Sequence, residues 1–433
     1  MQASRSSREL LAVLGVFLAL GLAYSLAIPL FEAPDEQLHV LYVRHLAEGR
    51  GLPVQRPSLR ASYAGQESSQ PPAAPGLALS VRPGGPRERG AAAMFSHDPA
   101  LERWPYGEAA LAVRLVRLLS LALGAMVVAA VYATARAVWP ARGSVALLAA
   151  ALAAFDPQFV FVASVVNNDN LLNATAAAAL WLAVRLALGE APRRAWWGLG
   201  AALGVGLLAK FSALALLALA GATAVLAAAR ERSAAPALRA LPALLLPPLL
   251  LAGWWFARNV ALYGEPFGWP THLASFGPSS GQPVLAAERW AEHAWLLVAS
   301  GWLAFGWMNV WAPLWFYLLF GALALASAGG WAFVLAQPRR RAELRTRWPA
   351  VALLAGWGAL IFILLLAWVS LTPAGRQGRL LFPALAAYAT LGAYGLVGWL
   401  PERYARPVAV AVAVGMALLA LWAYAAVLVP AYA

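Results

Sequence analysis

The stretch LLAVLGVFLALGLAYSLAIPLFEAPDEQLHVLYVRHLAEGRG, residues 10–51, joins a long apolar run to a polar segment. The apolar part, residues 10–30, has the length of about 20 residues that a helix needs to cross the hydrocarbon core of a bilayer. Arg5 and Arg8 precede it, but the run is longer than a signal-peptide core and has no clear cleavage site. We therefore expect an uncleaved transmembrane helix.

The polar part begins with a motif that suits chemistry at a membrane surface. Pro34 fits the first turn of a helix, and the helix dipole favours the acids Asp35 and Glu36 there. At helical spacing, His39 and Tyr42 share a face with Asp35. Asp35, Glu36 and His39 are therefore candidate catalytic residues, and a solvated helix start without a chemical role is the equally weighted alternative.

The composition places the whole chain in a membrane, since 62% of its 433 residues are hydrophobic and only 12% are charged. The chain has no cysteine, which excludes disulfides, thiol nucleophiles and cysteine metal sites. A net charge of +13 would suggest a nucleic-acid partner in a soluble protein. Here most arginines lie in short loops between apolar runs, as the positive-inside rule requires, so we expect no nucleic-acid partner.

Eleven apolar segments predict an all-α polytopic membrane protein with a single transmembrane domain over residues 1–433. The segment 195–229 is too long for one span and is divided at Lys210 into two short helices. The predicted spans are 10–30, 109–138, 144–165, a fourth ending at 188, the two halves of 195–229, 242–256, 311–335, 349–369, a tenth ending at 400, and 407–429. We expect external loops at 31–108, with the acid-bearing helix, and at 258–306, with a tryptophan-rich interfacial helix.

Arginine counts orient the predicted bundle with its N-terminus in the cytoplasm. This orientation puts the following residues on the cytoplasmic side: Arg142, Arg193, Arg194, Arg230, Arg232, Arg239, Arg339, Arg340, Arg341, Arg345, Arg347, Arg403 and Arg406. The polar residues that topology leaves unexplained then gather on the external side: Asp35, Asn168, Asp169, Lys210, Arg258, Arg376 and Arg379. That convergence predicts an external functional site.

Four cations are candidates for binding a phosphorylated ligand. Lys210 is the only lysine of the chain and interrupts the apolar run LLAKFSAL. A charge inside a span is a functional candidate, although a lysine near a helix end also snorkels to the interface. Arg258, Arg376 and Arg379 are simple helix-end or headgroup anchors in one interpretation. In the other, their guanidinium groups hold phosphate oxygens.

Glu67, Asn168 and Asp169 are weaker candidates, for substrate binding. Glu67 precedes a proline pair and is more simply a solvated loop acid, while residues of the other two types commonly cap helices. The chain has no P-loop, dinucleotide fingerprint or HExxH motif, so neither ATP-driven nor dinucleotide chemistry is indicated. A site of external acids and cations instead suits transfer from a phosphate leaving group.

Five blocks of the sequence resemble bacterial membrane proteins of the GT-C glycosyltransferase superfamily, in particular a subfamily labelled only as predicted membrane protein. They are PDEQLH (34–39), ESSQPP (67–72), SVVNNDNLLN (164–173), GLLAKFSAL (206–214) with ARNVALYGEPFG (257–268), and FGWMNVWAP (305–313) with GRQGRLLFP (375–383). The resemblance implies a GT-C fold with surface helices on a large first external loop. It also implies donors that carry sugars on polyprenyl phosphate, and an acid after the first helix as catalytic base.

The resemblance assigns three positions of this sequence. Asp35 matches the acid after the first helix, Glu67 the second acid before the proline pair, and Arg379 the arginine of the late block. The sequence departs from the pattern at residues 73–75, where Ala-Ala-Pro stands in place of the aromatic residues of many relatives. That departure bears on the acceptor or donor pocket.

These observations predict a multi-pass glycosyltransferase of the bacterial cytoplasmic membrane. It would move a hexosyl or pentosyl group from a polyprenyl-phosphate carrier to an acceptor glycan, lipid or protein on the external face. The sequence identifies no cofactor and leaves a divalent metal open. The alternatives are a transporter or flippase of lipid-linked sugars, for which charges deep in the bundle and symmetry between halves would argue, and a non-catalytic envelope-assembly subunit.

Overall fold

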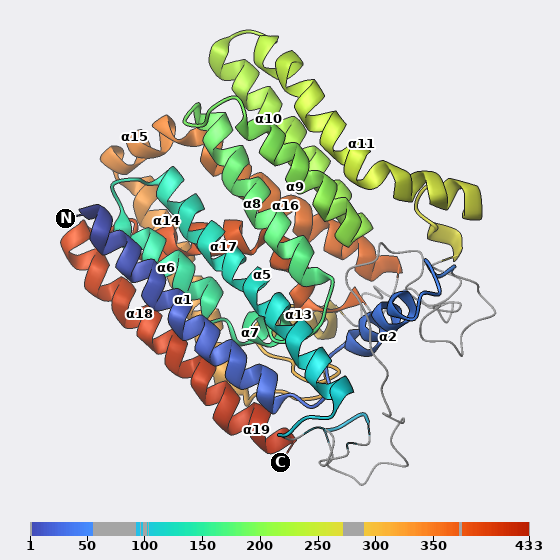
Figure 1. Cartoon of the computed structure of the whole chain (residues 1–433). Helices are drawn as coiled ribbons and strands as arrows, with labels where there is room; N and C mark the ends of the chain where they lie inside the picture. The colour runs from blue at the N-terminus through green and yellow to red at the C-terminus, as the bar shows by residue number, and fades with distance from the viewer. Residues whose placement is uncertain are drawn as a thin grey trace.

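The chain folds as a bundle of helices (Figure 1). The structure is a computed structural model and describes residues 2–54, 92–95, 97, 102, 104–271, 290–371 and 375–432. Within these residues every regular element is helical, and Phe305 and Val310 form an isolated antiparallel bridge. The predicted all-α polytopic fold is confirmed. Glu67 and residues 73–75 lie outside the described residues.

In chain order the helices are α1 Gln2–Ala27, α2 Glu36–Ala47, α5 Glu108–Val138, α6 Gly143–Ala154, α7 Pro157–Ala163, α8 Asp169–Leu188, α9 Ala195–Ala209, α10 Ala215–Glu231, α11 Ala235–Tyr263, α13 Trp290–Ser300, α14 Leu314–Ala336, α15 Pro338–Thr346, α16 Trp348–Leu371, α17 Leu385–Val397, α18 Glu402–Trp422 and α19 Val429–Ala431. The 3-10 turns η2 Phe211–Leu214 and η5 Gly378–Ala384 lead into α10 and α17. A π-helical turn, η6 Ala423–Leu428, joins α18 to α19.

Within the described ranges, nine helical stretches are long and apolar enough to cross a membrane, and a tenth is counted if the bent pair α6–α7 forms one span. Helix α9 is also apolar but has only 15 residues. All eleven predicted apolar segments are therefore helical, while a full crossing by α9 stays a prediction. The predicted interruption at Lys210 is confirmed, because α9 ends at Ala209 and α10 begins at Ala215.

The span predicted at 144–165 is broken in the structure, where α6 and α7 meet at 62°. Pro157 contributes to the break because it has no N–H for the helical hydrogen-bond ladder. Asp156 completes it by accepting hydrogen bonds from the amides of Gln158 and Phe159, which caps the start of α7. The prediction of one continuous helix here was wrong.

Helix α11 is longer than the predicted span 242–256, and Arg239 lies inside it rather than in a loop. The predicted span was placed between Arg239 and Arg258, and both arginines lie within α11. Three prolines also lie within α11, and membrane helices tolerate proline because neighbouring helices and local adjustments satisfy the freed backbone groups. The neighbour here is α9, whose Gly200 approaches α11 so closely that a Cβ would overlap the carbonyl of Ala243. Small residues at such crossings let membrane helices pack tightly.

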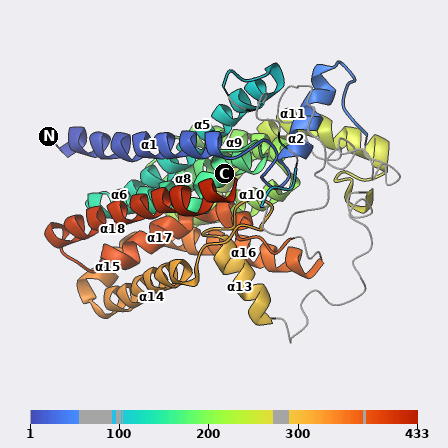
Figure 2. The same ribbon diagram turned by 90° about the horizontal axis from the view of Figure 1, so that it is seen from below.

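The two ends of the bundle differ in chemistry. The N-terminus and α15 lie at one end and α2 lies at the other (Figures 1 and 2). At the end with α15, arginine-rich connections bond across elements: Arg142 pairs with Glu343 at 3.1 Å, and Arg347 pairs with Glu190. By the positive-inside rule we expect this end to face the cytoplasm.

Candidate functional site

Asp35 stands at the start of α2, just after the chain has left α1. Its backbone is left-handed, with φ of 69°, a conformation that aspartate adopts more readily than most residues. Its Oδ2 accepts a hydrogen bond of 2.7 Å from Nη2 of Arg379. The side chain of Asp35 is 40% exposed and that of Arg379 only 5%, so a buried cation holds an acid that solvent reaches.

Arg379 is placed by a close crossing of two backbones. It lies in η5, directly after Gly378, which packs against the end of α13. A Cβ at Gly378 would overlap the backbone of Leu297 and Gly301, so a larger residue would push η5 away. The second glycine of the GRQGR block thus brings the guanidinium within reach of Asp35.

A second ion pair lies where α8 begins and α9 ends. Asp169, the first residue of α8, accepts a hydrogen bond of 2.8 Å from Nζ of Lys210, which lies in the extended break after α9. Asn168 makes no side-chain capping bond to α8, and its Nδ2 is 3.4 Å from the carbonyl oxygen of Ala209. Lys210 is therefore held by a buried carboxylate, and Asn168 links the two helix ends.

His39 lies one turn after Asp35 and within electrostatic reach of both ion pairs. Burial lowers the pKa of His39 from its usual 6.5, and Lys210 and Arg379 lower it further against the opposing effect of Asp35 and Asp169. The imidazole is therefore neutral at neutral pH and can donate or accept a hydrogen bond. We call Asp35, His39, Asp169, Lys210 and Arg379 the polar site. They were predicted to gather on one side of the membrane, and the structure brings them together.

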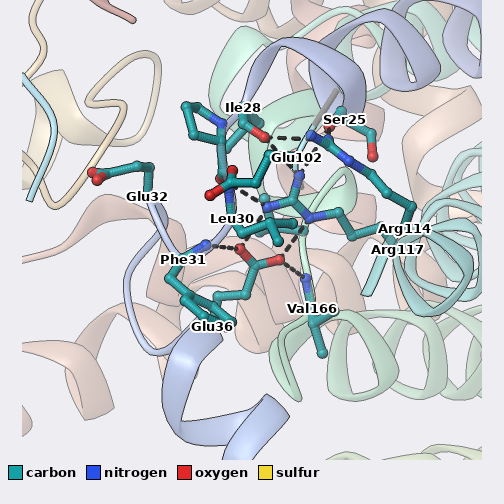
Figure 3. A network of polar contacts seen from close by, with 12 residues as sticks. Ser25, Ile28, Leu30, Phe31, Glu32, Glu36, Glu102, Arg114, Arg117 and Val166 are labelled. Atoms are coloured by element: carbon teal, nitrogen blue, oxygen red, sulfur yellow. Dashed lines mark hydrogen bonds and ion pairs between the residues drawn. The ribbon is translucent and has the colours of Figure 1, made fainter. Parts of the chain in front are cut away.

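Glu36, the second acid of the motif, is buried elsewhere. It is fully buried and forms a two-bond ion pair with Arg117, at 2.7 and 2.6 Å (Figure 3). It also accepts hydrogen bonds from the amides of Phe31 and Val166. Asp35 is thus the acid of the adjacent pair that remains accessible.

Two other arginines, which were predicted to bind phosphate, contact neighbouring segments. Arg258 on α11 donates to the carbonyls of Leu52 and Pro53 at 3.2 and 2.7 Å, which anchors the chain that follows α2. Nη1 of Arg376 lies 3.2 Å from Nδ1 of His293, which joins the turn before η5 to α13. Both arginines stay predicted phosphate ligands, and the described contacts give each of them a structural role.

Two buried arginines of the site region were not predicted, because most arginines of the sequence were expected in loops. Arg114 and Arg117 lie within α5, and Nη1 of Arg117 donates to the carbonyls of Ser25 and Ile28 at 2.9 and 2.8 Å. Both hydrogen bonds satisfy carbonyls where α1 ends. Two arginines in the apolar run VRLVRLL were a signal that could have found them, since charges inside spans are rare and functional by default.

A second group that was not predicted consists of Glu32, His97 and Glu102, which we call the Glu32–His97–Glu102 clasp. It connects residues near the two ends of the segment between α1 and α5. His97 lies between two carboxylates, with Nε2 3.0 Å from Glu32 and Nδ1 2.9 Å from Glu102. Glu32 also accepts the amides of Met94 and Phe95. Burial alone would lower the pKa of His97, but the hydrogen bonds to Glu102 and Glu32 raise it to about 9. The imidazole is therefore protonated at neutral pH and bridges the two acids.

Two basic side chains bring positive charge to the polar site. Asp35 is paired with Arg379, and Asp169 with Lys210. Across the part of the chain that the structure describes, no group of three or more His, Asp or Glu side chains is arranged to hold a metal ion. Arg379 and Lys210 thus place two basic groups in this region, each beside a carboxylate.

The fold and the polar site define a class: a polytopic membrane protein with paired acids and cations gathered at one end of a helix bundle. Residues 109–255 match the model of the dolichyl-phosphate-mannose-protein mannosyltransferase family. The match covers about a third of the chain, from α5 into α11, and includes Asp169 and Lys210 but neither Asp35 nor Arg379. It supports the relationship with the GT-C glycosyltransferase superfamily. No curated protein and no solved structure matches the chain.

Proposed function

We propose that this protein is a glycosyltransferase that moves a sugar from a polyprenyl-phosphate carrier to an acceptor at the polar site. The contact between Asp35 and Arg379 carries the proposal, because it places an accessible acid on a buried cation at the end of the bundle. The family matched by residues 109–255 is named for a donor on dolichyl phosphate, which is itself a polyprenyl phosphate. The transferred group is proposed to be a hexosyl or pentosyl group.

Asp35 is the proposed general base. The acceptor hydroxyl attacks the anomeric carbon of the donor sugar, and the new carbon–oxygen bond forms as the bond to the phosphate oxygen breaks. The hydroxyl proton passes to the carboxylate of Asp35, and the bonding electrons leave with the polyprenyl phosphate. A well-placed base of this kind contributes about 10²–10⁴-fold to the rate.

Arg379 and Lys210 are the proposed cations for the departing phosphate. A guanidinium carries five N–H donors, and the bonds to Asp35 and Gln377 use only Nη2 and Nε. The same side chain can therefore orient the base and bind a phosphate oxygen. Lys210 is 21% exposed and adds a second charge. Cations already in place stabilise the developing charge most effectively.

The remaining residues of the proposal act on the substrates. His39, neutral and one turn from Asp35, is proposed to orient the acceptor hydroxyl through a hydrogen bond. Asn168 and Asp169 are proposed to contact the donor near Lys210. Glu67 is proposed to contact the substrate, and Arg258 and Arg376 are proposed to bind the phosphate of the donor.

The proposed location is the bacterial cytoplasmic membrane, with the polar site on the external face. The arginine-rich connections at the opposite end of the bundle support this orientation. An external site would give a lipid-linked donor in the membrane and an envelope acceptor in water a common meeting place.

A flippase or transporter of lipid-linked sugars is the main rival. Charges deep in the bundle would favour it. Arg117 and Glu36 are fully buried charges, and they lie where α1 ends and α2 begins. They bond each other and nearby backbone groups, however, so their charges are satisfied within the protein. This arrangement is typical of a structural ion pair.

The experiment that separates these functions uses the purified full-length protein and a radiolabelled sugar on polyprenyl phosphate. We expect the label to move to an acceptor supplied in a membrane extract. The same preparation in sealed vesicles gives the alternative readout. Movement of the intact donor across the bilayer, without transfer of its sugar, would favour the flippase.

A further inference from the structure

Glu36 is a buried junction of the segments that carry the polar site (Figure 3). One carboxylate oxygen accepts the amide of Phe31, in the loop that leads to Asp35, at 3.0 Å. The other accepts the amide of Val166, three residues before Asp169, at 2.9 Å. A single side chain thus joins the two segments that supply the acids of both ion pairs.

Arg117 fixes this carboxylate to α5 and to the end of α1. Its Nε and Nη2 bond the two oxygens of Glu36 at 2.7 and 2.6 Å, and neither side chain is exposed. Its Nη1 donates to the carbonyls of Ser25 and Ile28. Because a paired guanidinium and carboxylate determine each other's orientation, the junction is rigid in direction as well as in position.

The loop that Glu36 holds has an unusual backbone. Phe31 and Asp35 both have φ of 69°, and for a bulky residue such as phenylalanine this conformation persists only where the surroundings impose it. Phe31 is held on both sides, since its amide bonds Glu36 and its carbonyl accepts Nε1 of Trp307 at 2.9 Å. Without the carboxylate, the loop would lose the contact that fixes its start.

We propose that Glu36 is a positioning residue which, together with Arg117, fixes Asp35 relative to the Asp169–Lys210 pair. The inference rests on the proposed function, in which the separation between Asp35 and the Asp169–Lys210 pair is the separation between the base and the leaving phosphate. A misplacement of about 1 Å at a reacting centre costs about 10²-fold in rate, so the effect should appear in kcat.

Two variants and one control test the role in catalysis. Glu36→Gln keeps the side-chain size but loses the charged pairing, and it should lower kcat by about 10²-fold with little change in KM for the donor. Glu36→Asp keeps the charge on a shorter chain and should retain more activity. The matched control is Glu402→Gln at the opposite end, since Glu402 also accepts a backbone amide and a hydroxyl, both from Ser144. The control should transfer like the parent.

The pH–rate profile separates positioning from catalysis. Its acid limb reports the ionisation of the base, so the limb persists in Glu36→Gln if Asp35 is the base. Loss of that limb in Glu36→Gln would show Glu36 to be the base itself and would overturn the proposal.

Spin-label distances test the positioning without relying on activity. The chain has no cysteine, so Ala47→Cys at the end of α2 and Val225→Cys on α10, both exposed, take labels at those two positions alone. We expect a narrow distance distribution in the parent and in Glu402→Gln, and a broadened or shifted one in Glu36→Gln. Where Glu36→Gln does not fold, Glu36→Asp replaces it under the same criterion.

The two proposals fail in different ways. Unchanged distances together with parental transfer in the Glu36 variants would overturn the positioning role. Absence of sugar transfer by the parent would instead refute the proposed function, and the distances would still confirm or overturn the coupling of α2 to the bundle.

Discussion

Arg379 donates a hydrogen bond from Nη2 to Oδ2 of Asp35, at 2.7 Å and across 344 positions of the chain. The turn that precedes α17 thereby holds the acid that precedes α2. Since a charge-assisted hydrogen bond fixes orientation as well as distance, any change that moves either partner should reduce sugar transfer. The predictions below change one element of this arrangement at a time.

Gly378→Ala should reduce transfer strongly, because the added methyl would overlap the backbone of Leu297 and Gly301 and displace Arg379. Overpacking of this kind costs about 1–3 kcal/mol of stability. The control is Gly356→Ala on α16, where a Cβ would meet no atom within 4 Å. Gly378→Ala should lower both the transfer rate and the thermal midpoint, whereas Gly356→Ala should transfer at the parental rate without loss of thermal midpoint. Equal behaviour of the two variants would remove the argument for a close crossing.

Lys210→Met should weaken donor binding by about 10–100-fold, since a hydrogen bond to a charged group contributes about 1.5–3 kcal/mol. Titration of the purified variant with polyprenyl-phosphate sugar measures the loss. Lys210→Arg keeps the charge and should recover part of the affinity. A Lys210→Met protein that bound and transferred donor like the parent would leave Lys210 as an interfacial anchor.

The Glu32–His97–Glu102 clasp should loosen at alkaline pH. The pKa of His97 is raised to about 9, so its stabilising contribution is complete below the unfolded-state value near 6.5 and is lost as the pH rises through about 9. The contribution is at most about 3–4 kcal/mol, since one pKa unit corresponds to about 1.4 kcal/mol. The thermal midpoint of the parent should fall over this interval more steeply than that of His97→Gln. Parallel curves would mean that the clasp does not titrate.

The arginine asymmetry predicts membrane orientation. A reporter fused after Leu335 should read cytoplasmic, and one fused after Thr372 should read external. The reverse pattern would place the polar site on the cytoplasmic side, where the proposed external acceptor could not reach Asp35.

Much of the fold could be predicted because simple rules act directly on the sequence. Apolar length located the helices, and the lone charge at Lys210 correctly divided the segment 195–229. The sequence also contains a signal for the break at Asp156–Pro157, since an acid before a proline is typical of a helix start. The apolar residues on both sides nevertheless favoured one continuous helix. Local chemistry therefore predicted where helices lie better than where they bend.

The partners within the site could not be predicted in the same way. Asp35 and Glu36 are adjacent acids, and helical geometry indicates only that they point in different directions. Which one is buried depends on Arg117, a residue of a different helix, and on the left-handed backbone at Asp35. Contacts of this kind arise from tertiary packing, which sequence spacing does not encode.

The most direct test of the central claim is the transfer rate of Asp35→Asn, measured with purified full-length protein and radiolabelled donor. Loss of the base should lower transfer by about 10²–10⁴-fold or abolish it, while donor binding and the thermal midpoint stay near those of the parent. The control is Glu48→Gln, an exposed acid just after α2 that pairs with Arg44 and should transfer normally. Parental transfer by Asp35→Asn would contradict the assignment of Asp35 as the base.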